Sequence, residues 1–439
     1  MPLLAAALIV RDEAARLPAC LDRLRRLGAL LQRTVVHDTG SRDDTARIAL
    51  RAGAIVVSGA WHDDFGLART VALDAARSTW ALVVDAGEEV VADPARLRAV
   101  LEGAGDDVDA LVVQVVELGP DGVERHATPT ARLVRPDRVR YDGRIGERAV
   151  GRDGTPPRTL AVPRDVLVLR HHPCADPADQ RRRAKRDLAL ADLQVEEAFD
   201  AVPDDDAAVV RALYHRARAL LAAGRLPEAL VDLEHLNALP VPVAERLWGL
   251  DLLAQVRLGL GDLAAVDALV PQLRHLGADE PYGTWLRARS LLGARRYAEA
   301  LPLLRTIERL VDPAGRELDL AAVVEARMLT AARVDARDEA LTCCVRLMAE
   351  LGRAEGLGPV LLAFWGDRPA RPLAALLAGT GGARGAAHVP AIAAELRACD
   401  APGPDVADLL VPPCAAAPPG PGASHGGATT PNRTDAART

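Results

Sequence analysis

This chain of 439 residues has few aromatic residues, no net positive charge and few long apolar runs. Phe, Trp and Tyr make up 3% of it, and Ala, Leu and Val carry its hydrophobic share, which favours closely packed helices. A net charge of −7 without a basic stripe excludes a general binder of nucleic acid or anionic membranes. The apolar run at residues 3–10 is too short to span a bilayer and lacks the features of a signal peptide. We therefore expect a cytoplasmic protein without membrane insertion.

Metal-binding and redox cysteine motifs are also missing. The six cysteines include one adjacent pair, Cys343 and Cys344, and none of them has CxxC spacing. This spacing argues against zinc and redox sites and predicts buried or incidental thiols in a reducing compartment. No GxGxxG follows the first apolar run, which excludes a dinucleotide-binding oxidoreductase.

The chain is organised around residues 80–90, WALVVDAGEEV. This apolar run breaks abruptly into acids, Asp85, Glu88 and Glu89. A central strand that ends in this way delivers carboxylates to the carboxyl edge of an α/β sheet, where open sheets of this class bind their ligands. We therefore expect the chemistry at this edge.

Strand-like and helix-like patterns alternate over the first 118 residues. Strands are predicted at 3–10, 34–37, 54–57, 80–85 and 110–118, and helices at 12–31, 41–50, 63–77 and from Pro94, with Ser41 and Asp93 as helix caps. This alternation specifies a parallel sheet with helices on both faces. Between residues 120 and 173, short Val and Leu runs separated by Gly, Pro and Asp predict antiparallel additions.

Beyond residue 176 the sequence becomes helical and repetitive. The stretch LLAAGRLPEAL at 220–230 aligns with LLGARRYAEAL at 291–301, 71 residues later, and weaker copies lie at 258–263 and 338–341. Apolar helix, short turn and second helix in this order resemble tetratricopeptide repeats, in which neighbouring pairs stack to bury a shared core. An irregular helical bundle is the alternative.

Six ordered segments of the N-terminal part carry a resemblance to a known family. They are ALIVRDE at 7–13, HDTGSRDDT at 37–45, WHDDFGLAR at 61–69, WALVVDAGEE at 80–89, RLVR at 132–135 and YDGRIGE at 141–147. In this order they resemble the family 2 inverting glycosyltransferases of the GT-A fold, and in particular the branch with C-terminal tetratricopeptide repeats. The resemblance covers residues 3–172. It implies a nucleotide-sugar-binding domain with a parallel or mixed α/β sheet, followed by an all-α helical repeat domain.

The pattern divides the chain into five predicted parts. They are a glycosyltransferase-like GT-A domain at 1–175, a linking helix at 176–203, tetratricopeptide-like repeats at 204–378, a weakly helical Ala- and Gly-rich segment at 379–410 and a disordered tail at 411–439.

The resemblance implies a nucleotide-sugar site made of five side chains: Asp12, Glu13, Asp38, Arg69 and Asp85. Carboxylates suit base N–H groups and ribose hydroxyls because each accepts more than one hydrogen bond. Glu147 keeps the family's acid in the acceptor region and is the candidate catalytic base for transfer with inversion. The residues alone also allow simpler roles, in which Asp38 shapes a turn, Arg69 is an exposed helix cation and Glu147 pairs with nearby arginines.

Three positions depart from the family pattern in this site. Gly87 replaces an aspartate that holds a divalent ion, usually Mg²⁺ or Mn²⁺, while Gly146 replaces a histidine and Thr70 an asparagine. Hard cations accept the carboxylate of either Asp or Glu. The remaining candidate metal ligands are Asp85, Glu88 and Glu89.

Without a metal, another cation has to neutralise the leaving diphosphate. The candidates from the sequence are Arg69, Arg132 and His172. A basic run at 181–186 is expected to face solvent on the linking helix.

Two functions of different classes follow. The first is a glycosyltransferase that moves a sugar from a nucleotide-sugar donor to an acceptor near the repeats. The second is a catalytically inactive glycosyltransferase-like scaffold whose repeats bind a protein or peptide partner in their concave groove. The substitutions at Gly87 and Gly146 keep the second hypothesis open.

Overall fold

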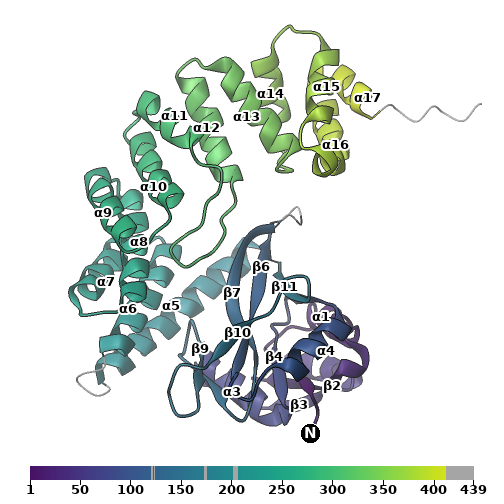
Figure 1. The fold of residues 1–439 in the computed structure, drawn as a ribbon, viewed down its shortest axis with the longest axis vertical. Coiled ribbons are helices and arrows are strands. Elements are labelled where there is room, and N and C mark those ends of the chain that lie inside the picture. Colours follow the sequence, from purple (N-terminus) through teal and green to yellow (C-terminus); the bar gives the residue numbers. More distant parts are fainter. Residues whose placement is uncertain (120–121, 123, 173–175, 201–205, 412–439) are drawn as a thin grey trace, which may run out of the picture. The chain divides into compact units, whose positions relative to one another are not determined.

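The computed structural model describes residues 1–119, 122, 124–172, 176–200 and 206–411 (Figure 1). Over these ranges a sheet domain is followed by helical pairs, which confirms the predicted fold class. The chain divides into two compact units, Met1–Leu347 and Met348–Thr439. The five-part division stays a prediction, and beyond Val411 the predicted disordered tail lies outside the described residues.

Short strands and helices alternate in the sheet domain, as the sequence pattern predicts. The strands are β1 (Leu4–Val10), β2 (Leu31–Asp38), β3 (Ile55–Ser58), β4 (Trp80–Val83), β5 (Glu88–Ala92), β6 (Ala110–Leu118), β7 (Glu124–Val134), β8 (Val139–Asp142), β9 (Arg148–Gly151), β10 (Thr159–Ala161) and β11 (Leu167–His171). The helices are α1 (Leu17–Arg25), η1 (Gly28–Leu30, a 3₁₀ turn), α2 (Thr45–Arg51), α3 (Phe65–Ala76) and α4 (Pro94–Gly103).

The main sheet is mixed. Its strand order is β3-β2-β1-β4-β7-β6-β11-β5, with β10 also paired to β6, while β8 and β9 form a separate ribbon. The strands β3, β2, β1 and β4 are parallel, whereas β7 is antiparallel to both β4 and β6. The prediction of antiparallel additions between residues 120 and 173 is confirmed for β7 and for the β8–β9 ribbon, but β10 and β11 pair parallel with β6, and the early strand β5 is antiparallel to β11.

Helices cover both faces of the sheet because side chains alternate along each strand. On one face, Leu4, Ala6 and Leu8 of β1 pack with apolar side chains of α1, α2 and α4. On the other face, Ala5 and Ala7 pack with α3 and with the β8–β9 ribbon. These core residues hold the carboxyl ends of β1, β2 and β4 at one edge of the sheet.

Residues 80–90 form two strands rather than the single central strand that the sequence predicts. The strand β4 ends at Val83, residues 84–87 turn, and β5 begins at Glu88 at the far edge of the sheet, where it pairs with β11. Asp85 therefore lies in a turn after a central strand. Glu88 and Glu89 belong to a different strand from the one that delivers Asp85.

Of the two predicted helix caps, Asp93 and Ser41, only Asp93 caps a helix. Asp93 caps α4, since its side chain accepts hydrogen bonds from the backbone N–H groups of Ala95 and Arg96. Ser41 does not cap a helix, because α2 begins later, with Asp44 at the cap position. The Ser41 hydroxyl instead accepts a hydrogen bond from the Asp12 backbone at 3.0 Å.

A long helix, α5 (Pro177–Asp200), precedes the helical pairs. The pairs are α6 (Asp206–Ala222) with α7 (Leu226–Ala238), α8 (Val243–Leu260) with α9 (Leu263–His275), α10 (Glu280–Gly293) with α11 (Tyr297–Arg305), and α12 (Ala321–Arg333) with α13 (Arg337–Ala349). The aligned stretches at 220–230 and 291–301 fall on the α6–α7 and α10–α11 turns, as the repeat pattern predicts. The shared core of these pairs includes the fully buried Leu233, Val256 and Leu286.

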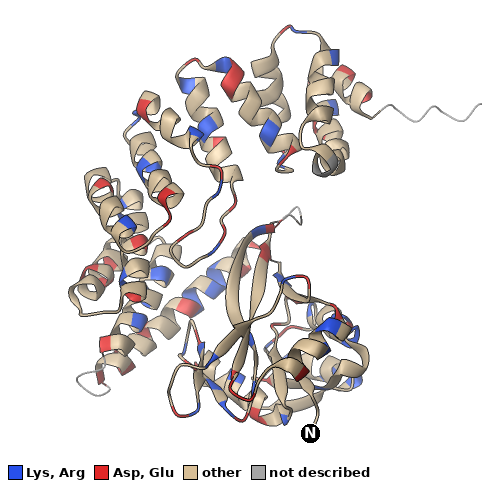
Figure 2. Ribbon diagram, in the orientation of Figure 1, with Lys and Arg blue, Asp and Glu red and all other residues tan. Residues whose placement is uncertain are grey.

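The second unit contains further helices. They are α14 (Gly358–Trp365), α15 (Ala370–Gly379), α16 (Gly382–Arg397) and α17 (Gly403–Leu410). Basic and acidic residues are interspersed along the helices and strands (Figure 2). Within the described ranges, none of the helices combines the length and the apolarity needed to cross a membrane.

Candidate active site

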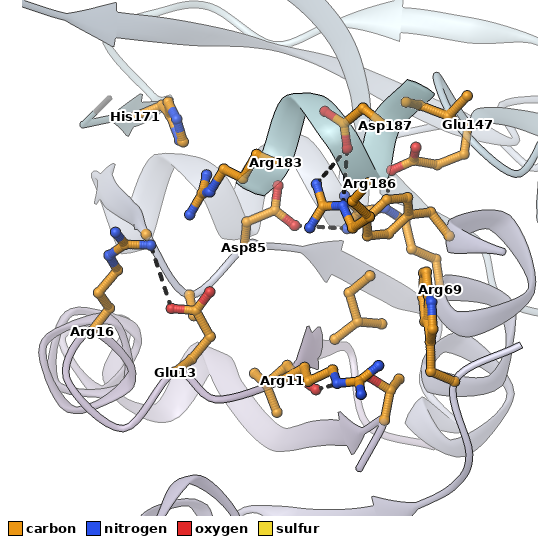
Figure 3. A pocket seen from close by; sticks show the side chains of 18 of the residues that line it. Arg11, Glu13, Arg16, Arg69, Asp85, Glu147, His171, Arg183, Arg186 and Asp187 are labelled. Atoms are coloured by element: carbon orange, nitrogen blue, oxygen red, sulfur yellow. Dashed lines mark hydrogen bonds and ion pairs between the residues drawn. The ribbon is translucent and has the colours of Figure 1, made fainter. Parts of the chain in front are cut away.

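A cavity of about 330 Å³ opens at the carboxyl ends of β1, β2 and β4. This is the edge at which the sequence predicts the site. The walls come from the turns after these strands, from α3, from residues 143–147 between β8 and β9, and from α5 (Figure 3). The charged and aromatic lining residues are Arg11, Glu13, Arg16, Trp61, Phe65, Arg69, Asp85, Glu147, His171, His172, Arg183, Arg186 and Asp187.

Asp85 is held between two arginines in the wall of this cavity. Its Oδ1 lies 2.9 Å from Arg69 Nη1, and its Oδ2 lies 3.4 Å from Arg132 Nη2. Arg69 is only 8% exposed, so its charge requires a nearby anion. Burial would raise the pKa of Asp85, but Arg69 and Arg132 outweigh this effect and hold that pKa well below its usual range. Asp85 is therefore an ionised partner of two guanidinium groups.

Glu147 is the second acid that Arg69 holds. Arg69 Nε donates a hydrogen bond to Glu147 Oε1 at 2.6 Å, and 15% of the Glu147 side chain is exposed. One buried guanidinium of α3 thus positions two carboxylates from separate loops. Of the two arginines near Glu147 in the chain, Arg144 and Arg148, Arg144 pairs with Glu197 of α5 instead. Arg69 is therefore not an exposed helix cation: it is buried and binds two carboxylates of the cavity wall.

The helix α5 fixes the loop that carries Glu147. The backbone N–H of Ile145 donates to Gln194 Oε1 at 3.1 Å, and Arg144 pairs with Glu197 one turn further along α5. On the other side of the loop, the backbone N–H of Phe65 donates to the Arg144 carbonyl at 3.1 Å. The predicted linking helix therefore takes part in shaping the cavity.

The five predicted nucleotide-sugar residues lie at the expected edge but not all in the cavity. Three of them line it: Glu13, Arg69 and Asp85. The other two bind the 40–42 turn: Asp12 Oδ1 accepts from the Arg42 backbone at 2.7 Å, and Asp38 Oδ1 accepts from the Ser41 backbone at 2.8 Å. Asp38 thus shapes a turn in this structure, and the roles of all five residues toward a donor stay predictions.

Arginines bind the predicted metal ligands: Asp85 and Glu88 share Arg132, and the Asp85 backbone N–H donates to Glu88 Oε2 at 2.9 Å. Glu88 Oε1 accepts a hydrogen bond from Arg132 Nη2 at 2.8 Å, and Glu89 pairs with Arg23. Burial also raises the pKa of Glu88, which makes it a poorer ligand. Among the described residues, no group of three or more His, Cys, Asp or Glu side chains is placed to hold a metal ion. Mg²⁺ and Mn²⁺ require oxygen ligands, so these arginine-bound carboxylates do not fit either ion.

The cations that the sequence predicts to neutralise the leaving diphosphate are already close to carboxylates. Arg69 and Arg132 are engaged with Asp85, and His172 Nε2 lies 3.8 Å from Glu89. The expectation that residues 181–186 face solvent is wrong for Arg183, which is half-buried in the cavity wall, whereas Arg186 lines the cavity and is exposed as expected.

Helical spacing explains the positions of these two arginines and could have revealed them. Leu190 and Ala191 are buried on the inner face of α5, and residues 183, 186 and 187 continue that face by one and two turns. Arg186 lies over the ring of Phe65, 5.0 Å from its centroid, and the rings of Phe65 and Trp61 are 4.9 Å apart. Both aromatic residues come from the WHDDFGLAR segment, although the sequence reasoning assigned them no role.

The two family departures at glycine have different structural settings. Gly146 has a φ of +63°, which disfavours other residues, and a Cβ at this position would overlap the ring of His215 on α6. At Gly87, the nearest atom to an added Cβ would be Arg16 Cδ at 3.9 Å, an ordinary contact. Steric packing therefore accounts for glycine at position 146 but not at position 87.

Residues 6–155 match the sequence model of glycosyl transferase family 2. The matched segment includes β1, α3, the Asp85 turn and Glu147. Residues 6–155 are a family 2 glycosyltransferase domain. Most of the cavity wall belongs to this glycosyltransferase domain, whereas β11, His171, His172 and α5 follow it in the chain.

Two further comparisons are with individual proteins, each matched over part of its length. A TPR repeat-containing protein of Synechococcus elongatus is 39% identical over 139 residues, which make up 31% of this chain and 32% of that protein. The match thus spans less than half of the relative's length. Glucosyl-3-phosphoglycerate synthase from Mycobacterium tuberculosis, solved with Mn²⁺, UDP-glucose and phosphoglyceric acid, is 22% identical over 27% of this chain and 44% of its own, with a TM-score of 0.22.

A further comparison is with a solved structure of TPR-like repeats. The structure, described as nearly identical TPR-like repeats of a putative kinesin light chain from Podospora anserina, is 18% identical to this chain. The match covers 38% of this chain and 90% of the other, with a TM-score of 0.30. Both structural scores are low, and the family match alone identifies the glycosyltransferase domain.

Restoring the family residue should affect the free energy of unfolding strongly at Gly146 and little at Gly87. We expect Gly146→His to lower the free energy of unfolding by about 2 kcal/mol or more, because it combines an unfavourable φ with the His215 overlap. Gly87→Asp should change it by less than about 0.5 kcal/mol. Urea unfolding followed by tryptophan fluorescence measures both, and equal midpoints for the two variants would contradict this packing.

His215 should make the stability of the chain depend on pH. Its burial, with help from Arg218 and Arg211, lowers its pKa from 6.5 to about 4. The unfolded chain therefore binds this proton at higher pH than the folded chain. The stabilisation is complete above pH 6.5 and is lost as the pH falls toward 4. We expect a contribution of about 3 kcal/mol over this window, from about 1.4 kcal/mol per pKa unit.

The test compares urea unfolding at several pH values for the unsubstituted chain and His215→Gln. The slope between pH 4 and 6.5 should become shallower in His215→Gln, whatever the variant's stability at neutral pH. The exposed His62, changed to Gln, is the control and should keep the original slope. An unchanged slope in His215→Gln would show that this imidazole is not the group responsible.

Proposed function

We propose that this protein transfers a sugar from a nucleotide-sugar donor to an acceptor hydroxyl, with inversion at the anomeric carbon. The family 2 glycosyltransferase domain supports glycosyl transfer. The observation that carries the proposal is the position of Glu147, a carboxylate held by Arg69 at 2.6 Å in the wall of the cavity that Glu13 and Asp85 also line. The donor would lie at the ends of β1, β2 and β4.

Glu147 would act as the general base. The acceptor oxygen attacks the anomeric carbon of the donor sugar while its proton passes to the Glu147 carboxylate. The bond from that carbon to the diphosphate oxygen breaks, and the diphosphate leaves with the bonding electrons. A single displacement of this kind inverts the configuration. Arg69 would hold the carboxylate in position until it takes up the proton.

The helical repeats would present the acceptor or bind a protein partner. Stacked helix pairs provide extended surfaces for peptides and proteins, and α5 joins the described repeats to the cavity through Gln194 and Glu197. A partner bound to α6 would lie next to residues 143–147, since His215 of α6 contacts Gly146.

A second candidate function is an inactive scaffold with the same partner-binding repeats. It is favoured by the pairing of Asp85 and Glu88 with buried arginines and by the pairing of Glu89 with Arg23. The two functions differ in whether any nucleotide sugar is consumed.

Replacing the proposed base should abolish turnover while leaving the fold intact. Glu147→Gln keeps the shape of the side chain and a hydrogen-bond acceptor for Arg69, so we expect nucleotide-sugar binding within a few-fold of the original. Transfer should fall by about 10²- to 10⁴-fold, as expected for loss of a general base. The assay measures nucleoside diphosphate released from UDP-, GDP-, ADP- and dTDP-sugars, with and without a panel of hydroxyl acceptors.

The exposed Glu102 of α4, changed to Gln, is the matched control and should retain full activity. Activity of Glu147→Gln equal to that of Glu102→Gln would refute the base assignment. Absence of turnover in the unsubstituted chain with every donor and acceptor would favour the scaffold.

A further inference from the structure

The cavity brings one arginine from outside the glycosyltransferase domain close to Asp85 and Gly87. Arg183 comes from α5, beyond the matched segment 6–155, and lines the cavity with Arg16, Gly87 and His171. Figure 3 shows Arg183 reaching from α5 toward the side of the cavity that holds Asp85, Arg16 and Glu13. Burial raises the pKa of Glu13, and Arg16 and Arg183 both oppose that rise, which agrees with their closeness.

Among the arginines that line the cavity, Arg183 and the exposed Arg11 have no ion-pair or hydrogen-bond partner in the described part of the chain. Arg69 is taken up by Asp85 and Glu147, Arg16 lies 3.6 Å from Glu13, and Arg186 lies 2.6 Å from Asp187. Arg183 makes no hydrogen bond or ion pair with any of the residues that the structure describes, yet it is half-buried. A guanidinium in a confined space without an anion is suited to an anionic ligand.

Position 87 complements this cation. The family aspartate at this position would add a negative charge next to the diphosphate and would need a metal ion to offset it. Glycine removes that charge, and the Arg16 side chain lies against the space instead, with its Cδ 3.9 Å from where a Cβ would be. Packing does not require glycine here, and the acid is absent from a cavity that a cation from α5 also lines.

We propose that Arg183 binds the diphosphate of the donor directly, beside Arg16, and that this guanidinium charge takes the place of a divalent metal ion. This inference rests on the proposed function, since it concerns the same donor. A diphosphate presents several oxygens that a planar guanidinium can contact in pairs, and such contacts need no metal bridge. The same charge would stabilise the diphosphate as it leaves.

A consequence is that the donor site is completed by the helix that leads to the repeats. The helix α5 supplies Arg183 to the donor and Gln194 to the loop that carries Glu147. Donor and proposed base are therefore both aligned by one helix outside the glycosyltransferase domain.

The test is calorimetric titration of the full chain with UDP, GDP, ADP and dTDP, in EDTA and again in Mn²⁺. We expect at least one of them to bind in EDTA with an affinity within about threefold of that in Mn²⁺. Arg183→Gln should weaken that binding by about 10- to 100-fold, the loss expected for a charged hydrogen bond. The matched control is Arg181→Gln on the same helix, which removes the same charge at an exposed position that does not line the cavity. It should change the affinity by less than about twofold.

The outcomes separate this inference from the function on which it rests. Binding that requires Mn²⁺, or equal affinities for Arg183→Gln and Arg181→Gln, would overturn the role of Arg183 and leave the glycosyltransferase proposal standing. Failure of all four nucleotides to bind under both conditions would overturn the donor site itself. Near-UV circular dichroism confirms that both variants keep the fold.

Discussion

The carboxylate of Asp85 lies between the guanidinium groups of Arg69 and Arg132, and the other parts of the site are arranged around this contact. Arg69 belongs to α3, Arg132 to β7 and Asp85 to the turn after β4, so three separate elements meet in one charged cluster. Because the two guanidinium groups are buried while the Asp85 side chain is 36% exposed, removing the carboxylate would leave buried cations without their anion. Because the cluster also includes Glu147 and Glu88, each carboxylate of the wall is held in one place by an arginine.

This arrangement separates two kinds of charge in the cavity. Asp85 and Glu88 are already neutralised by buried arginines, which leaves them unsuited to binding a metal ion. Other cations that line the cavity come from the turn after β1 and from α5. An anionic ligand that enters the cavity would therefore meet guanidinium groups on the side of Gly87, and Glu147 on the side of the 143–147 loop. This separation of charges fits a nucleotide-sugar donor whose diphosphate lies near the guanidinium groups and whose reactive carbon lies near Glu147.

The elements that depend on local pattern were predictable from the sequence. The strand at 110–118 has the predicted bounds, Asp93 caps α4 as expected, and the repeated stretches at 220–230 and 291–301 fall on helix-pair turns. The site was located at the correct edge of the sheet for the same reason, since Glu13, Arg69, Asp85 and Glu147 occur in motifs of fixed spacing.

The features that depend on distant pairing were not predictable in this way. Glu88 follows Asp85 closely in the chain, but it belongs to β5, which pairs with β11, and its carboxylate shares Arg132 with Asp85 without lining the cavity. Arg183 lies in a basic run with the composition of a solvent-facing surface, and only the docking of α5 on the 143–147 loop turns it toward the cavity. In both cases the tertiary contact decides which charge a residue meets.

The most direct test of this account is a crystal structure of the chain grown with UDP and MnCl₂, with anomalous data collected at the manganese absorption edge. The account predicts phosphate oxygens within hydrogen-bond distance of the Arg183 guanidinium, Asp85 still bound to Arg69 and Arg132, and no anomalous peak between Asp85 and the diphosphate. A manganese peak that bridges Asp85 and the phosphates, with Arg183 turned away, would contradict it.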